Sequence, residues 1–222
     1  MNKRQVREVL DLVAGMFPDA RCELNHSNPF ELTIAVLLSA QCTDETVNKV
    51  TADLFKKYRS PEDYLAVPLE QLENDIKRIG LFRNKAKHIR ELCRILLEEY
   101  GGQVPEQHSE LVKLPGVGRK TANVVVSNAF GVPAIAVDTH VERVSKRLGI
   151  ANWNDSVLEV EKKLMSKVPR EEWTLTHHRF IFLGRYHCKA QNPKCEGCEL
   201  LHLCREGKER MKPAATRKNI KV

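Results

Sequence analysis

The pattern that most restricts the fold of this chain is a helical spacing of apolar residues along nearly its whole length. Apolar residues recur every three or four positions, which places them on one face of an α-helix. Examples are the series Val6, Val9, Leu10, Val13 and Phe17, and the series Ile89, Leu92, Cys93, Leu96, Leu97 and Tyr100. No segment shows the sustained alternation of apolar and polar residues that is typical of a half-buried strand. The sequence therefore predicts an all-α fold.

The longest apolar run covers residues 32–40 and is interrupted only by Thr33 and Ser39. Because it is apolar on most sides, it predicts a buried central helix. The run is too short to cross a bilayer. With 222 residues, of which 42% are hydrophobic, the chain has the composition of a soluble globular protein with one large core or two smaller ones.

A segment suited to holding a phosphate covers residues 114–123, Leu-Pro-Gly-Val-Gly-Arg-Lys-Thr-Ala-Asn. Gly116 and Gly118 allow the backbone N–H groups to turn outward, and a helix is predicted directly afterwards over residues 121–130. The start of a helix favours an anion, because its first N–H groups lack partners and its dipole is positive there. Lys120 adds a primary amine close by. The spacing matches neither a Walker A loop nor a dinucleotide-binding loop, and an ordinary glycine corner between helices is the alternative.

Four cysteines near the C-terminus follow the spacing Cys-x6-Cys-x2-Cys-x5-Cys: Cys188, Cys195, Cys198 and Cys204. Disulfides are disfavoured because no signal peptide precedes the chain, which indicates a reducing compartment. Structural zinc usually takes two Cys-x-x-Cys pairs, and only one is present here. The uneven spacing favours a [4Fe–4S] cluster, with zinc as the alternative. We assign no chemistry to the other three cysteines, Cys22, Cys42 and Cys93.

The formal charge of +7 is compatible with a nucleic-acid partner, but the charge is unevenly distributed. Residues 205–222 contain seven Lys or Arg and two Glu, a net charge of +5, which leaves only about +2 for the rest of the chain. A basic surface on the body of the protein must therefore come from clustering. We interpret the tail, residues 212–222, as a solvated end rather than as a specific DNA-binding arm.

Taken together, three motifs resemble endonuclease III, a helix–hairpin–helix DNA glycosylase and lyase family of base-excision repair. They are the hairpin Leu114–Lys120, the segment Val137-Asp138-Thr139-His140-Val141, and the cysteine loop. Shorter similarities are Leu38-Ser39-Ala40-Gln41, Gly80-Leu81 and Gly184-Arg185-Tyr186. The resemblance extends from about Val6 to Glu209. It implies removal of oxidised pyrimidines from duplex DNA, β-elimination 3′ to the abasic site, and a [4Fe–4S] cluster held by the four cysteines.

The resemblance also implies two helical domains that flank a DNA-binding cleft. Residues 22–132 would form a six-helix domain with the hairpin. Residues 1–21 and 133–211 would form a discontinuous domain with the cluster, followed by the basic tail. The expected partner is double-stranded DNA with a damaged base or an abasic site. A monomer in the cytoplasm, associated with the nucleoid through DNA binding and without a membrane partner, is expected.

Two residues would carry the chemistry that the resemblance implies. Lys120 would attack the sugar and form a Schiff base, which requires a neutral amine; the helix N-terminus and partial burial would both favour that form. Asp138 would stabilise the positively charged sugar and relay protons. The alternatives are a lysine that binds phosphate as a plain cation and an aspartate that caps a helix. Thr139 and Glu142 form a capping-box pattern, so we expect Thr139 to be the cap and Asp138 to be free.

The remaining candidates would bind DNA. A base must leave the duplex to be reached, and the resemblance implies that Gln41 and Leu81 fill the gap it leaves. Inward packing is the alternative for Leu81, and for the adjacent Phe82 it is the reading we favour. Contacts with the DNA backbone are expected from the hairpin residues Gly116, Val117, Gly118 and Arg119, and from Lys189 and Lys194 in the cysteine loop.

Two other functions remain compatible with the sequence. An adenine-mismatch glycosylase can share this scaffold, although such relatives usually lack the lysine and carry a large additional C-terminal domain. A DNA-binding protein without activity could use the hairpin and the cluster only for binding. A covalent adduct formed with abasic-site DNA in the presence of borohydride, and lost in Lys120→Ala, would support the lyase over both.

Overall fold

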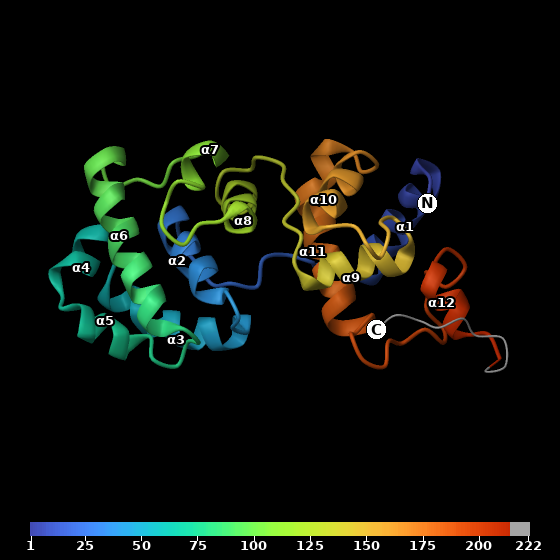
Figure 1. Cartoon of the computed structure of the whole chain (residues 1–222), viewed down its shortest axis with the longest axis horizontal. Coiled ribbons are helices and arrows are strands. Elements are labelled where there is room, and N and C mark those ends of the chain that lie inside the picture. The colour runs from blue at the N-terminus through green and yellow to red at the C-terminus, as the bar shows by residue number, and fades with distance from the viewer. Residues whose placement is uncertain (214–222) are drawn as a thin grey trace. The chain divides into compact units, whose positions relative to one another are not determined.

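The computed structural model describes residues 1–213, so nearly all of the tail at residues 212–222 lies outside the described residues. The described chain is helical and contains no strand, which confirms the predicted all-α fold (Figure 1). It divides into two compact units. One is the continuous segment Cys22–Val132, and the other joins Met1–Arg21 to the chain from Pro133 onward. No helix of the described residues is long and apolar enough to cross a membrane.

The Cys22–Val132 unit is built around helix α2. Its helices are α2 (Pro29–Ser39), α3 (Asp44–Lys57), α4 (Pro61–Ala66), α5 (Leu69–Asp75), α6 (Phe82–Tyr100), α7 (His108–Leu111) and α8 (Arg119–Ala129). Helix α2 contacts α3, α6 and α8, whereas α4 and α5 pack against α6. The unit therefore surrounds α2 with helices, which is the position that its sequence predicts.

Local sequence explains where α2 begins and why it is buried. Asn28 accepts a hydrogen bond from the N–H of Glu31 at 2.9 Å, and Pro29 occupies the first turn, where its missing N–H is not needed. Every residue from Leu32 to Leu38 is buried. Each large apolar side chain buried in this way stabilises the fold by about 1.5–3 kcal/mol.

The other unit is organised around helix α9. Its helices are α1 (Lys3–Met16), α9 (Thr139–Leu148), α10 (Val157–Met165), α11 (Trp173–Phe182) and α12 (Arg205–Arg210), with a 3₁₀ turn η1 (Arg170–Glu172) and a π-helical turn η2 (Leu183–His187). Helix α9 contacts α10, α11, α12 and η2. Its apolar face, Val141, Val144 and Leu148, lies in one core with Val6, Val9, Leu10 and Val13 of α1.

Gly184 lets the turn η2 approach α9 closely. A Cβ atom at this position would lie 2.8 Å from the Cβ of His140 and 3.2 Å from its Cα. The carbonyl of Gly184 also accepts a 2.7 Å hydrogen bond from the guanidinium of Arg143 on α9. The glycine is therefore required by packing rather than by its backbone angles.

Substitution of Gly184 by alanine is expected to lower the free energy of unfolding by about 1–3 kcal/mol, because the added methyl group displaces His140. Urea unfolding followed by circular dichroism measures the change. Gly15→Ala in α1 is the matched control: a Cβ there meets no atom within 4 Å, and alanine favours a helix more than glycine does. Equal stability of wild type and Gly184→Ala would contradict this packing role.

The start of helix α8 differs slightly from the sequence prediction. Helix α8 begins at Arg119 rather than at Thr121, because Gly118 already serves as its N-cap. This difference matters for function, since it places Lys120 at the second residue of α8.

Candidate functional site

The segment Leu114–Gly118 is a tight hairpin between two helices, α7 and α8. Gly116 adopts a left-handed conformation with φ of 75°, and the N–H of Val117 donates to the carbonyl of Leu114 at 3.0 Å. The chain then extends at Gly118 and enters α8. The predicted glycine turn in front of a helix is therefore present, as a helix–hairpin–helix.

The two glycines of the hairpin have different roles. A Cβ atom on Gly116 would lie 2.9 Å from the Leu37 side chain of α2 and 3.2 Å from His88 of α6, so the fold requires glycine there. Gly118 has φ of −82°, which any residue can adopt, and a Cβ atom there would meet nothing within 4 Å. The fold itself gives no reason for glycine at position 118. Because Gly118 has no side chain, a ligand can come close to the protein backbone on this face of the hairpin.

The start of α8 presents donors and charge to solvent. The first N–H groups of a helix have no partner within it, and Gly118, Arg119 and Lys120 are all exposed. Val117 differs from them, because its side chain is 3% exposed and its N–H is already bonded within the turn. Gly118, Arg119 and Lys120 therefore stay candidates for binding a phosphate, whereas Val117 contributes packing.

The expected partial burial of Lys120 is wrong for this structure, because the side chain is exposed. Its place in the first turn of α8 remains, next to the positive end of the helix dipole. Any desolvation of this amine must therefore come from a bound ligand and not from the fold of its own unit.

Asp138 is the N-cap of α9, and the expectation that Thr139 would take this place is wrong. The Asp138 Oδ1 atom accepts hydrogen bonds from the N–H groups of His140 at 2.9 Å and Val141 at 2.8 Å. Asp138 itself has an extended backbone, as N-cap residues usually have, and this conformation lets its side chain reach both N–H groups of the first helical turn. Both bonds use one oxygen, Oδ1, and the side chain is half-buried. Capping therefore fixes the carboxylate while Oδ2 takes part in neither bond.

Two further candidates lie on loops of the Cys22–Val132 unit. Gln41 and Leu81 both adopt left-handed conformations, with φ of 55° and 57°, which are unfavourable for residues with a side chain. Leu81 is 58% exposed, so the inward packing considered for it is excluded. Phe82 is half-buried and lies under the guanidinium of Arg83, 5.0 Å from the ring centre. The strain at Gln41 and Leu81 marks them as candidates for contact with a ligand.

The four cysteines of the C-terminal loop line one cavity, together with Arg147, Leu183 and His187 among others. Among the described residues, no three His, Cys, Asp or Glu side chains converge on a point that could hold a single metal ion. The four thiols around one cavity are the set of ligands that a [4Fe–4S] cluster takes. Burial raises the pKa of Cys204 to about 11, so iron must displace its proton on binding.

Two N–H groups are directed at the sulfur atoms. Arg147 Nη1 donates to Cys188 Sγ at 3.4 Å, and the N–H of Gly207 donates to Cys204 Sγ at 3.2 Å. Hydrogen bonds to cysteine sulfurs stabilise negative charge on thiolates and tune the reduction potential of iron–sulfur clusters. The first and last cysteines of the loop therefore have the surroundings that a thiolate ligand requires.

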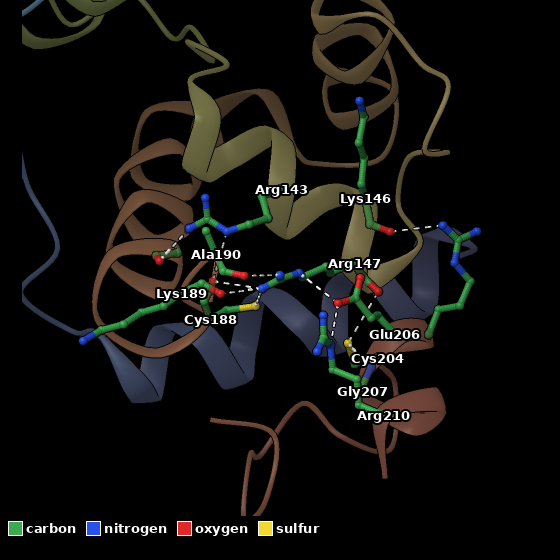
Figure 2. A network of polar contacts seen from close by, with 12 residues as sticks. Arg143, Lys146, Arg147, Cys188, Lys189, Ala190, Cys204, Glu206, Gly207 and Arg210 are labelled. Atoms are coloured by element: carbon green, nitrogen blue, oxygen red, sulfur yellow. Dashed lines mark hydrogen bonds and ion pairs between the residues drawn. The ribbon is translucent and has the colours of Figure 1, made fainter. Parts of the chain in front are cut away.

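Arg147 on α9 connects both ends of the cysteine loop, as Figure 2 shows. Its guanidinium donates to the carbonyls of Lys189 at 2.7 Å and Ala190 at 2.9 Å, and its own carbonyl lies 3.5 Å from Cys204 Sγ. Its Nε atom lies 3.1 Å from Glu206, with both side chains only 5% exposed. This residue was not among the sequence predictions. The signal for it was an arginine inside α9, directly before the buried Leu148.

The lysines of the cysteine loop are exposed. Lys189 and Lys194 both reach solvent, and the N–H of Lys194 donates to the carbonyl of His187 at 3.3 Å, which closes the loop back onto η2. Their exposure is compatible with a contact to DNA phosphates and also with simple solvation. Their predicted role stays a prediction.

Comparison with known proteins agrees with these features. The family model "HhH-GPD superfamily base excision DNA repair protein" matches residues 34–170, and the model "iron-sulfur binding domain of endonuclease III" matches residues 188–204. The loop accordingly binds a [4Fe–4S] cluster.

Similar proteins match nearly the full length of the chain. Endonuclease III of Bacillus subtilis (strain 168) is 69% identical over 96% of this chain and 97% of its own. Endonuclease III of Escherichia coli (strain K12) is 48% identical over 95% and 99%. The solved "Structure of a Trapped Endonuclease III-DNA Covalent Intermediate: Estranged-Adenine Complex" matches with a TM-score of 0.93 and 70% identity, over 96% of this chain and 100% of that one. With its hairpin and its cysteine cavity in place, the chain belongs to the endonuclease III family of base excision DNA repair proteins.

Proposed function

We propose that this chain, a DNA glycosylase and abasic-site lyase by family, removes oxidised pyrimidines from duplex DNA through a Schiff base on Lys120. The observation that carries the proposal is the exposed amine of Lys120 at the second residue of α8, directly after the open hairpin. A solved relative is described as a trapped covalent intermediate with DNA, and such a bond requires a nucleophile on the protein.

The chemistry follows from the amine. Lys120 Nζ attacks C1′ of the deoxyribose, the glycosidic bond breaks with its electron pair going to the departing base, and the sugar opens as an imine to the lysine. The imine acidifies the C2′ proton, and loss of that proton expels the 3′ phosphate by β-elimination. The N–H groups at Gly118–Lys120 bind the DNA backbone and hold the sugar near the amine, since Gly118 leaves that face open.

Asp138 acts on the departing base and the sugar through Oδ2, the carboxylate oxygen that accepts neither capping bond. Its negative charge stabilises the oxocarbenium-like sugar and favours proton transfers to and from Lys120. The two capping bonds hold the carboxylate in one orientation, so the cap and the proposed role support each other.

Asp138→Asn is expected to slow base removal by about 10²-fold or more while leaving stability nearly unchanged, because asparagine caps as well as aspartate but carries no charge. Asp138→Ala should show the same loss of rate and, in addition, lose about 1 kcal/mol of stability through the missing cap. Single-turnover excision and thermal unfolding separate the two effects. If Asp138→Asn excises bases at the wild-type rate, Asp138 is a cap and nothing more.

DNA recognition would use the remaining candidates. We propose that Gln41 and Leu81 occupy the gap left by the extruded nucleotide, because both are held in strained, outward conformations. The four cysteines Cys188, Cys195, Cys198 and Cys204 would ligate the cluster, and Lys189 and Lys194 would face DNA phosphates. The cellular site would be the cytoplasm, on nucleoid DNA.

Trapping with borohydride tests the proposed function. Borohydride reduces an imine to a stable amine, so wild-type protein incubated with a duplex carrying an oxidised pyrimidine should form a covalent adduct visible on a denaturing gel. An adduct with abasic DNA but none with the damaged base would restrict the activity to the lyase step. The absence of both adducts would refute the Schiff-base mechanism.

A further inference from the structure

A buried lysine connects the two loops that carry Gln41 and Leu81. Lys85 on α6 is only 4% exposed, and its Nζ atom donates hydrogen bonds to the carbonyls of Leu38 at 3.0 Å and Ala40 at 2.5 Å. Both carbonyls belong to the C-terminal end of α2, immediately before Gln41. The side chain of a residue on α6 thus closes the end of the central helix.

The other loop joins the same helix, because Leu81 is the N-cap of α6. The N–H of Lys85 donates to the carbonyl of Leu81 at 3.1 Å, which is the ordinary first-turn bond of the helix. The two loops also lie next to each other directly, since a Cβ atom on Gly80 would be 3.6 Å from the carbonyl of Gln41. Lys85 is therefore hydrogen-bonded to Leu81 itself and to Ala40, the residue directly before Gln41.

The C-terminal end of α2 favours a positively charged group such as the ammonium of Lys85. The last carbonyls of a helix lack partners within it and form the negative end of its dipole, so an ammonium group satisfies both. Burial lowers the pKa of Lys85, which shows that placing the charge here is unfavourable in itself. An apolar residue would fill the space without that cost, but it would leave the carbonyls of Leu38 and Ala40 without a donor.

Left-handed backbone at two residues with side chains persists only where the surroundings hold it. We propose that Lys85 is a positioning residue that locks the loops of Gln41 and Leu81 into one rigid unit for insertion into the DNA stack. This inference rests on the proposed function, in which those two side chains fill the gap. It assigns no chemistry to Lys85 itself, whose amine is buried and bonded.

The test compares duplex with single-stranded abasic DNA. Lys85→Met keeps the length of the side chain and removes its donors and charge, so kcat/KM on a damaged duplex should fall about 10-fold or more. Cleavage of single-stranded abasic DNA, which has no stack to be filled, should change less than twofold. Lys85→Arg keeps charge and donors and should restore most of the duplex activity. Lys87→Met, an exposed position on the same helix, is the matched control.

A spectroscopic readout separates positioning from mere stability. 2-Aminopurine placed opposite the lesion fluoresces when it loses its stacking, so the wild type should raise its emission on binding and Lys85→Met should raise it much less at saturating protein. A variant with a lower melting temperature but an unchanged ratio of duplex to single-strand activity would refute the inference. Equal losses on both substrates would refute it as well.

Failure of the inference is distinguishable from failure of the proposed function. If Gln41→Ala and Leu81→Ala lose duplex activity but Lys85→Met does not, Lys85 alone is wrongly assigned. If neither alanine variant loses duplex activity, the role proposed for the two loops is wrong. Should Lys85→Met fail to fold, amide hydrogen exchange of the wild type decides: slow exchange at Gln41 and Cys42 is expected, and rapid exchange would show that the loop is not locked.

Discussion

Lys120→Ala is expected to lose at least about 10³-fold of the strand-cleavage rate and all of the borohydride-trapped adduct. Alanine has no amine to attack C1′, and no imine can form to acidify the C2′ proton. Because Lys120 is exposed and at the second residue of α8, its truncation leaves no buried group unsatisfied. The melting temperature should therefore remain that of the wild type. Single-turnover cleavage of an abasic duplex on a denaturing gel measures the rate.

Lys113→Ala provides the matched control for charge. Lys113 is another exposed lysine just before the hairpin, paired with Glu110 at 2.9 Å, and its removal subtracts the same charge from the same region. This variant should keep its cleavage rate and its adduct. Cleavage by Lys120→Ala at the rate of Lys113→Ala would show that Lys120 is a phosphate-binding cation and that the nucleophile lies elsewhere.

Arg147→Met should have the largest effect on stability and on retention of iron. Glu206, 5% exposed, would be left with Arg210 at 2.7 Å as its remaining cation, and breaking a buried ion pair costs about 3–5 kcal/mol. The carbonyls of Lys189 and Ala190 would also lose their donor, and Cys188 Sγ would lose a hydrogen bond. The purified variant should contain less iron, show weaker visible absorbance and lose its cluster faster in air.

Arg94→Met is the matched control for Arg147→Met, because it removes the same charge from an ion pair that is exposed rather than buried. Arg94 also pairs with two carboxylates, Glu91 and Glu98, but all three side chains are about half exposed on α6. Exposed pairs contribute little, since water already solvates the charges, so this variant should keep its stability and its iron. If Arg147→Met retains iron as well as Arg94→Met does, the loop is held by its thiolates alone and the arginine is dispensable.

Much of the fold was predictable because its signals are local. The spacing of Val6, Val9, Leu10 and Val13 predicted α1, and the apolar run at residues 32–40 predicted the buried α2. Glycine spacing predicted the turn before α8, and the resemblance predicted the family. Helix periodicity, glycine turns and cysteine spacing all act over a few residues, so a sequence displays them directly.

The competition between Asp138 and Thr139 was not decided by the sequence. Both residues are good caps, and the capping-box pattern of Thr139 with Glu142 favoured the wrong one. The choice depends on where the chain leaves its extended conformation, and this is set by packing of α9 in its core. The exposure of Lys120 is likewise a tertiary property, because the sequence around it is compatible with a buried or an open helix start.

The sequence by itself determined the helical architecture, the hairpin, the position of the amine and the set of four thiols, since each depends on residues close together in the chain. Only the tertiary structure decided which distant groups hold the loops of the site: Lys85 bonds carbonyls 45 and 47 residues away, before Gln41, and Arg147 bonds the cysteine loop more than 40 residues away. Lysine and arginine have long side chains with several donors, and no local pattern specifies which unsatisfied carbonyl a folded chain will bring within their reach.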